Sequence, residues 1–239
     1  MKSFLLALQF LTRIPLRINV GDDPALAGRS LLWYPLVGGL MGVVLYGIAV
    51  LMANQSGLLT AAMILIIWVL ITGGLHLDGL ADSADAWAGG YGDKEKTLAI
   101  MKDPHVGSFA VVMLVLVLIL KFAALGELVK SDNLIYLIIA PMLARSAAVF
   151  LFITTPYVRQ NGLGSNMALH LPHTAAIIVL LLFVVPVIIL QFIAVVAAIL
   201  VLAGLRYLML KRIGGMTGDT IGASIEIVEV VVLAGLVVF

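Results

Sequence analysis

The chain has no cysteine among its 239 residues, and this absence excludes several kinds of chemistry. Thiolate metal sites, disulfide bonds and a cysteine nucleophile are all ruled out. Charge is also scarce, because 11% of the residues are Asp, Glu, Lys or Arg, where a soluble domain has about 25%. The net charge of +1 gives no basis for binding nucleic acid, and we expect no nucleic-acid partner.

The chain is instead rich in long apolar runs. Its residues are 63% hydrophobic and its mean hydropathy is +1.19, which is typical of a polytopic protein in a lipid bilayer. We therefore predict an all-α fold with about seven transmembrane helices (six to eight), forming one integral-membrane domain over residues 1–239. The expected spans are Leu31–Ala53, Leu58–Leu75, Ser108–Leu128, Leu134–Thr154, two within 174–210, and Thr220–Phe239.

Two segments need separate interpretation. The stretch 174–210 is long enough for two spans that reverse near Pro186 and Gln191, although one long kinked helix also fits its length. The N-terminal stretch Met1–Ile18 is apolar but is soon interrupted by polar residues and proline, and no small-residue cleavage site follows. It predicts an interfacial helix and not a secretory signal.

Basic residues in the connecting loops predict the orientation. If the amino terminus is cytoplasmic, the opposite side receives only Lys130. The cytoplasmic side then receives Lys2, Arg13, Arg17, Arg29, Lys94, Lys96, Lys102, Arg159, Arg206, Lys211 and Arg212. We expect a multi-pass protein of the cell (inner) membrane with its amino terminus and its active site on the cytoplasmic face.

A stripe of carboxylates follows the second apolar run. Residues 76–85 read HLDGLADSAD, and on a helix Asp78, Asp82 and Asp85 lie within roughly 60° of one another. Like charges grouped beside hydrocarbon are costly unless a cation lies among them. Oxygen ligands favour Mg²⁺ or Mn²⁺ over Zn²⁺, so the stripe predicts a divalent-metal site, with a solvated helix extension as the alternative. His76 points about 160° away from Asp78 and suits a structural hydrogen bond.

A second polar cluster precedes the last apolar run. Residues 214–220 read GGMTGDT, and glycines before a helix let backbone N–H groups approach an anion closely. Gly215, Thr217 and Gly218 are therefore candidates for binding a substrate phosphate. Asp219 is a candidate metal ligand, with an ordinary helix N-cap as the simpler alternative.

Four further charged residues stand out by position. Glu226 lies about 10 Å into the last span, where an unpaired carboxylate costs several kcal/mol. Arg145 lies some 12 Å inside its span and should face the bundle interior, paired with either a carboxylate or a substrate phosphate. Lys121 is expected to reach the opposite membrane surface along its aliphatic stem. Lys102 belongs to a polar turn that is either a solvated loop or a phosphate contact.

These motifs together carry a resemblance to a known family. The chain resembles the cobalamin synthase family of adenosylcobinamide-GDP ribazoletransferases, and the likeness extends from near residue 9 to Glu229. It is carried by QFLTRIP at 9–15, GGLHLDGLADSAD at 73–85, MKD at 101–103, GLG at 162–164 and GMTGDTIGA at 215–223.

The resemblance implies a membrane enzyme with Mg²⁺ as cofactor. The family transfers the adenosylcobinamide phosphate group from adenosylcobinamide-GDP to α-ribazole or α-ribazole 5′-phosphate. The products are adenosylcobalamin or its 5′-phosphate, and GMP. Asp78, Asp82 and Asp219 are then expected to hold the metal that bridges the diphosphate.

The remaining roles follow within the same resemblance. Asp85 is the first candidate for accepting the proton of the attacking hydroxyl, and Asp82 and Glu226 are the other catalytic candidates. Arg145 or Lys102 would balance the phosphate charge.

Two other functions are compatible with parts of the pattern. A CDP-alcohol phosphotransferase also uses an aspartate-rich helix, but Asp82 stands where that motif has an arginine. A cation-coupled transporter would hold its carboxylates near mid-membrane, whereas these lie at the end of a span. Oligomeric state has no local signature, and a homo-oligomer is compatible with the sequence.

Overall fold

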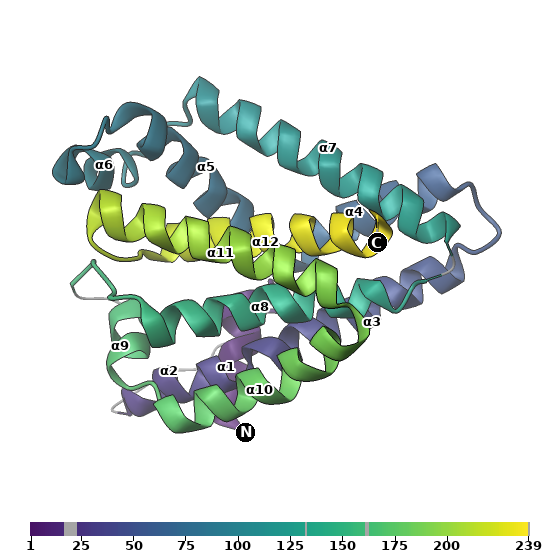
Figure 1. Ribbon diagram of the computed structural model, residues 1–239, viewed down its shortest axis with the longest axis horizontal. Coiled ribbons are helices and arrows are strands. Elements are labelled where there is room, and N and C mark those ends of the chain that lie inside the picture. The colour runs from purple at the N-terminus through teal and green to yellow at the C-terminus, as the bar shows by residue number, and fades with distance from the viewer. Residues whose placement is uncertain (17–22, 132, 161–162, 239) are drawn as a thin grey trace.

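The computed structural model describes residues 1–16, 23–131, 133–160 and 163–238. Within these ranges the regular structure is helical, apart from an isolated parallel bridge between Tyr157 and Met216. The long helices run side by side along the longest dimension of the molecule (Figure 1). This arrangement confirms the all-α fold predicted from composition.

The long apolar helices form the body of the bundle. A short α2, a 3₁₀ turn and α3 run on continuously from Ala25 to Leu51. The bounds of these elements are α2 Ala25–Ser30, η1 Leu31–Trp33, α3 Tyr34–Leu51, α7 Ser108–Lys130, α8 Tyr136–Thr154, α10 His173–Leu190, α11 Phe192–Ile213 and α12 Gly218–Val238.

Shorter helices complete the chain. Their bounds are α1 Lys2–Leu11, α4 Gly57–Thr72, α5 Leu75–Gly89, α6 Lys94–Ile100 and α9 Leu163–Leu169. Among the described residues, six helices are long and apolar enough to cross a membrane, and a seventh is counted if α4 and α5 form one bent span. The predicted number of about seven is therefore confirmed. The long stretch after residue 173 is indeed two helices, which reverse at Gln191.

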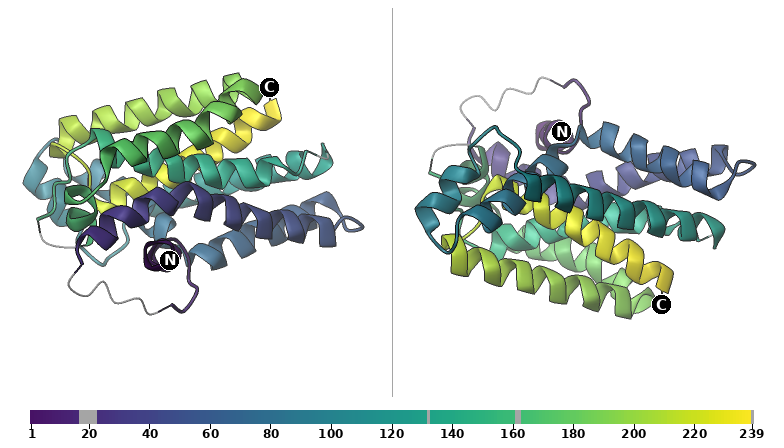
Figure 2. Two further views of the ribbon diagram at one scale, coloured as in Figure 1. Left: turned by 90° about the horizontal axis from the view of Figure 1, so that it is seen from below. Right: turned by 90° about the horizontal axis from the view of Figure 1, so that it is seen from above.

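Helix α1 lies across the long helices instead of along them, as Figure 2 shows by viewing it end-on. Its inward face buries Leu6, Ala7 and Leu11, while Lys2 stays exposed. An amphipathic helix at this angle has the geometry that an interfacial helix needs.

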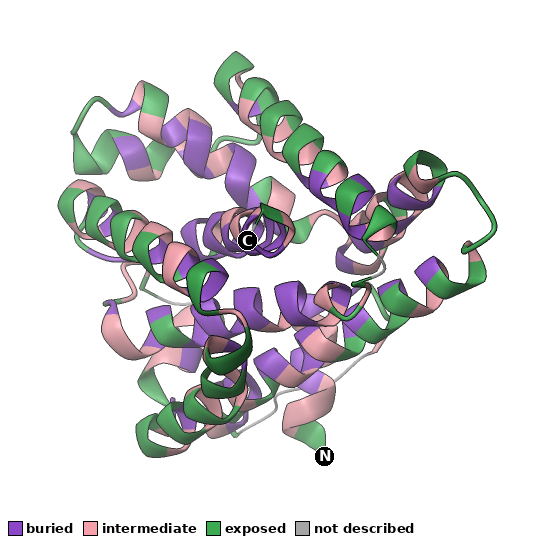
Figure 3. Cartoon of the chain, turned by 45° about the vertical axis from the view of Figure 1, so that its right-hand side comes forward, coloured by how far each residue is buried: buried purple, intermediate pink, exposed green. Residues whose placement is uncertain are grey.

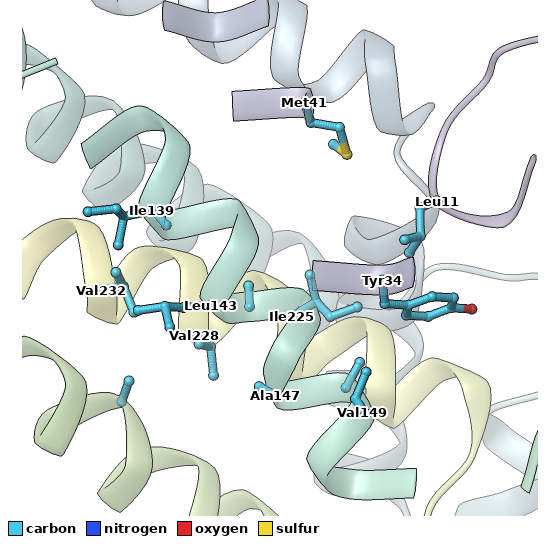
Figure 4. Close-up of a cluster of buried hydrophobic side chains, with 14 of the residues drawn as sticks. Leu11, Tyr34, Met41, Ile139, Leu143, Ala147, Val149, Ile225, Val228 and Val232 are labelled. Carbon is cyan, nitrogen blue, oxygen red and sulfur yellow. The ribbon is translucent and has the colours of Figure 1, made fainter. Parts of the chain in front are cut away.

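The core of the bundle surrounds α12 and α8, which are the most buried of the long helices (Figure 3). Ile139 and Leu143 of α8 pack near Val228 and Val232 of α12, as Figure 4 shows. Helix α10, by contrast, is 11% buried. Its exposed leucine and isoleucine side chains are explained by contact with lipid.

The connections between helices divide between the two ends of the bundle (Figure 1). The α5–α6–α7, α8–α9–α10 and α11–α12 connections, which carry the polar motifs, gather at one end. The α3–α4, α7–α8 and α10–α11 turns lie at the other end. The polar motifs thus share one end of the bundle, as the alternation of spans predicts. Gly162 of the GLG motif and Arg17, one of the basic residues counted for the orientation, lie outside the described residues.

A sharp bend separates α4 from α5. Gly73 and Gly74 have φ values of +62° and +71°, a conformation that glycine adopts without strain. The two helices meet at an angle of 86°. Helix α4 has 16 residues, about 24 Å by helical rise, and so reaches most of the way through a bilayer by itself. The bend turns α5 away from the span direction and leads it toward the end that carries the polar connections.

Candidate active site

Helices α5 and α12 approach each other closely where the two acidic motifs lie. A Cβ atom added at Gly79 would lie 2.7 Å from the backbone oxygen of Asp219, and one added at Gly222 would lie 3.3 Å from the Cα of His76. Small residues at a helix crossing allow such backbone proximity. The glycines therefore bring the segments around residues 78 and 219 together, although more than a hundred residues separate them in the sequence.

The acidic cluster consists of Asp78, Asp82 and Asp85 of α5 with Asp219 of α12. Asp78 is exposed, and the other three side chains are partly buried. Partial burial, together with the charges of Asp78 and Asp219, raises the pKa of Asp82 to about 6. The carboxylates thus repel one another, and this is the situation that a bound cation relieves.

One arginine opposes this negative charge. Arg159 NH2 lies 2.6 Å from Asp219 Oδ2, an ion pair that lacks the geometry of a hydrogen bond. The same guanidinium lies 3.5 Å from the backbone oxygen of Met101. Arg159 also lowers the pKa of Asp82, which places it within electrostatic range of both helices.

Asp78, Asp82 and Asp219 fit a divalent cation by their chemistry, because carboxylate oxygens are the ligands that Mg²⁺ prefers. No three acidic or histidine side chains within the described residues already converge as a ligand set. Holding a metal ion would therefore require these side chains to move. The site is open enough for this, since Asp78 is exposed.

Asp85 has a different environment from its neighbours on the stripe. Its Oδ2 accepts the N–H of Gly107 at 2.5 Å, and its Oδ1 accepts the N–H of Ala110 at 2.9 Å. A Cβ at Gly107 would lie 2.6 Å from Oδ1, so a side chain there would displace the Asp85 carboxylate from this position. Asp85 therefore caps the first turn of α7 from another helix. Both oxygens are engaged, which makes this residue a poorer proton acceptor than its position in the sequence predicts.

The turn before α12 is capped by threonines. Thr220 N donates to Thr217 Oγ1 at 3.3 Å, and Thr217 N donates to Thr220 Oγ1 at 2.9 Å. The expected alternative role of Asp219 as an ordinary N-cap is thus filled by Thr217, and the Asp219 carboxylate is left for the cluster. A Cβ at Gly215 would lie 2.2 Å from the backbone oxygen of Pro156, so Gly215 serves a close backbone crossing.

A second group of charges is buried between α7, α8 and α12. We call it the buried ion cluster: Lys121 of α7, Arg145 of α8, and Glu226 and Glu229 of α12, each at most 2% exposed. Lys121 Nζ lies 3.0 Å from Glu226 Oε2 and also contacts Glu229, which in turn pairs with Arg145. His76 Nδ1 lies 3.3 Å from Arg145 NH2, so this histidine makes the structural hydrogen bond expected of it.

This cluster bears on three sequence-based expectations and overturns the one for Lys121. Lys121 does not extend to the membrane surface but points inward, with its Nζ 4.2 Å from the centroid of the Trp68 ring. Arg145 pairs with the carboxylate of Glu229, which is one of the two alternatives that its position predicted. Glu226 is buried and paired with Lys121, which supports a structural role for this residue. The pairing satisfies charges that would otherwise be costly inside the bundle.

A cavity of about 230 Å³ adjoins the acidic cluster. Asp78 and Asp219 belong both to the cluster and to the cavity wall. The rest of the wall comes from α1, α3, α5, α8, α9 and α12 together with Tyr157. Burial raises the pKa of the Tyr157 phenol, whose oxygen accepts the N–H of Gly218. The phenol therefore stays protonated and can still donate a hydrogen bond.

Comparison with known proteins identifies the family. A family model described as cobalamin-5-phosphate synthase matches residues 3–237. The chain belongs to this family.

Curated relatives support the assignment over the full length. A protein of Pseudomonas fluorescens (strain Pf0-1) is 52% identical over 238 residues and covers 98% of each chain. One of Stutzerimonas stutzeri (strain A1501) is 50% identical over 241 residues, covering 99% of this chain and 98% of its own. Both carry the name adenosylcobinamide-GDP ribazoletransferase. No solved structure matches the chain.

In this member of the family, sequence reasoning did not identify two residues that lie beside the acidic cluster. Arg159 was one basic residue among many in the charge distribution, and Tyr157 had no motif of its own. A parallel bridge places both beside the acidic cluster: Met216 N donates to Pro156 O at 2.8 Å and Val158 N donates to Met216 O at 2.9 Å. Lys102 is exposed and follows Met101, whose sulfur lies 3.7 Å from Thr217 Oγ1.

Proposed function

We propose that the protein transfers the adenosylcobinamide phosphate group from adenosylcobinamide-GDP to α-ribazole or its 5′-phosphate. GMP is released, and the step is a late one in cobalamin biosynthesis. The observation that carries this proposal is the meeting of α5 and α12 at Gly79 and Asp219, which assembles four carboxylates beside a cavity. Family membership and the names of relatives about 50% identical over the full length support it.

The reaction exchanges one phosphate ester for another. A hydroxyl oxygen of the acceptor forms a bond to the phosphorus that carries adenosylcobinamide, and the phosphoanhydride bond to GMP breaks. The bond electrons leave with GMP. The transition state spreads negative charge over the phosphoryl oxygens, so alignment and charge neutralisation supply most of the rate enhancement.

We propose that Asp78, Asp82 and Asp219 hold Mg²⁺, or Mn²⁺ in its place. When bound, the metal neutralises charge on the diphosphate. Arg159 holds Asp219 in position and adds a positive charge beside the leaving phosphate. Lys102 is a further phosphate contact, and the N–H groups at Gly215, Thr217 and Gly218 remain phosphate candidates.

The proton of the attacking hydroxyl needs an acceptor. Asp85 was the first candidate from the sequence, but its two oxygens already accept backbone N–H groups. Asp82 has no such commitment among the described hydrogen bonds, so we assign the proton to Asp82.

The localisation is inferred from the end of the bundle that carries the polar motifs and the acidic cluster. We infer that the chain is one integral-membrane domain in the cell (inner) membrane, with its amino terminus and the acidic cluster on the cytoplasmic side. Lys130 pairs with Glu127 at the opposite end, which agrees with the bias of basic residues. A homo-oligomer is compatible with this arrangement.

The test is an assay of the purified protein in lipid nanodiscs with adenosylcobinamide-GDP, α-ribazole and Mg²⁺, following GMP release. We expect turnover that EDTA abolishes and that Mg²⁺ or Mn²⁺ restores. The Asp82→Asn variant should lose turnover and require more Mg²⁺. An unaltered Mg²⁺ titration in this variant would contradict metal binding by Asp82, and the absence of GMP release by the unmodified protein would contradict the proposed reaction.

A further inference from the structure

The cavity beside the acidic cluster has two kinds of wall. One part of the wall is formed by Asp78 and Asp219, which also belong to the acidic cluster. Elsewhere it is lined mainly by apolar and aromatic side chains, among them Phe10, Phe152 and Ile225. A ligand that fills this cavity therefore presents an apolar body to the bundle and a polar group to the aspartates.

We infer that this cavity holds the aromatic base of the acceptor nucleoside, so that the ribose faces Asp78 and Asp219. The inference rests on the proposed function, because it assigns a place to one of the two substrates of that reaction. In α-ribazole this base is dimethylbenzimidazole, a fused two-ring system without exocyclic hydrogen-bonding groups.

Size favours the acceptor base over the other parts of the substrates. A cavity of about 230 Å³ lies below the roughly 300–1,000 Å³ of typical drug-sized sites. It is too small for a corrin ring and suits a bicyclic base. A larger apolar hollow of about 610 Å³ lies between α8, α10, α11 and α12, but none of the acidic-cluster residues lines it.

Polarity favours dimethylbenzimidazole over the guanine of the donor. Guanine carries several donors and acceptors, and burying them without partners is costly. The buried polar side chains at the wall already have partners: His76 contacts Arg145 and Tyr34 donates to the sulfur of Met167 at 3.8 Å. The two aspartates are assigned to the metal.

Aromatic side chains provide stacking surfaces for a flat base. The rings of Phe152 and Tyr157 stack with their centroids 6.3 Å apart and an interplanar angle of 5°. Phe10 of α1 lines the same cavity and is partly exposed. Helix α1, which crosses the bundle, thus contributes directly to the binding of the acceptor.

Phe10→Ala is the variant that tests this assignment, and Phe4→Ala is its matched control. Both phenylalanines lie on α1 and are partly buried, but Phe4 packs against Trp33, with ring centroids 5.5 Å apart, and does not line the cavity. We expect Phe10→Ala to raise the KM for α-ribazole about tenfold or more. Its KM for adenosylcobinamide-GDP should stay within about twofold of the unmodified value, and Phe4→Ala should leave both unchanged.

A second variant and a binding measurement keep the test independent of folding and of turnover. Leu163→Ala removes a cavity side chain that is 47% exposed, so its effect on folding is small. Equilibrium binding of α-ribazole, followed by the fluorescence of its base without donor present, should weaken in both cavity variants.

A series of acceptors tests the chemistry of the cavity in the unmodified protein. We expect kcat/KM to fall from the dimethylbenzimidazole riboside to the benzimidazole riboside and again to the adenine riboside, by about tenfold at each step. An adenine riboside that reacts equally well would overturn the inference. So would a Phe10→Ala variant that weakens binding of GDP or adenosylcobinamide-GDP instead of α-ribazole, since the cavity would then hold the donor. In both cases GMP release by the unmodified protein leaves the proposed function intact.

Discussion

Two charged clusters share helix α12, and they differ in charge balance and in burial. In the buried ion cluster two cations, Lys121 and Arg145, face two carboxylates, Glu226 and Glu229. In the acidic cluster four aspartates share one described arginine, Arg159, and most of them keep contact with solvent. Only two helical turns of α12 separate Asp219 from Glu226.

The difference separates a structural site from a binding site. Charges inside a bundle are retained when they are paired, so the buried ion cluster is complete without any ligand. The acidic cluster has an excess of negative charge that a cation would remove. The buried ion cluster also ties α7, α8 and α12 together and reaches α5 through His76. It therefore fixes the relative position of the helices that carry the aspartates.

The largest effect on stability should come from the buried ion cluster. Arg145→Met removes one partner of a buried pair and leaves Glu229 with Lys121 as its remaining charged partner, which should cost about 3–5 kcal/mol of unfolding free energy. A reversible unfolding titration in SDS micelles measures this. The double variant Arg145→Met with Glu229→Leu should recover much of the loss. A loss below about 1 kcal/mol in the single variant would contradict the structural role.

A substitution in the acidic cluster should instead lower turnover and leave stability almost unchanged. Asp219→Asn should lower turnover by about 10²–10³-fold, which corresponds to about 2.7–4 kcal/mol of transition-state stabilisation. Its stability should change little, because the lost ion pair with Arg159 is partly exposed and repulsion within the cluster is relieved. Steady-state kinetics and the same unfolding titration check this. Glu95→Gln, an exposed change on α6 at the same end, is the control and should alter neither quantity.

The pH dependence of metal binding should follow Asp82. Because its pKa is raised to about 6, its carboxyl is mostly ionised at pH 7 and mostly protonated at pH 5. A cation must displace this proton, so affinity for Mg²⁺ should fall as the pH drops through 6, by about tenfold between pH 7 and pH 5. Without a cation, the same raised pKa favours the fold as the pH falls through this range. Mn²⁺ binding followed by electron paramagnetic resonance tests the dependence, which Asp82→Asn should reduce.

The smallest effect should come from Asp85. Asp85→Ala removes a cap from α7 and should cost about 1 kcal/mol of stability, with increased amide exchange in the first turn of α7. Turnover should fall by less than about tenfold. A loss of about 10²–10⁴-fold with unchanged stability would instead restore Asp85 as the proton acceptor.

Local sequence patterns predicted much of the fold and part of the site. The apolar runs predicted the long helices. The reversal at Gln191 was predicted because residues 174–210 are long enough for two spans. Asp78, Asp82 and Asp219 were recognised because charged carboxylates next to apolar runs are energetically costly unless a cation neutralises them. The same reasoning found Arg145 and Glu226 but did not identify their partners, because spacing along one helix does not say which neighbour that helix faces.

The amino-acid sequence by itself determined that the chain is a helical membrane protein with two acidic motifs at helix ends, since hydropathy and helical periodicity are local properties. The tertiary structure decided which charges meet. It paired Lys121 and Arg145 with the glutamates of α12, used Asp85 as a cap, and brought Arg159 to Asp219. The reason is physical: these contacts join residues far apart in sequence, and they form only once the helices have packed, as α5 and α12 do at Gly79.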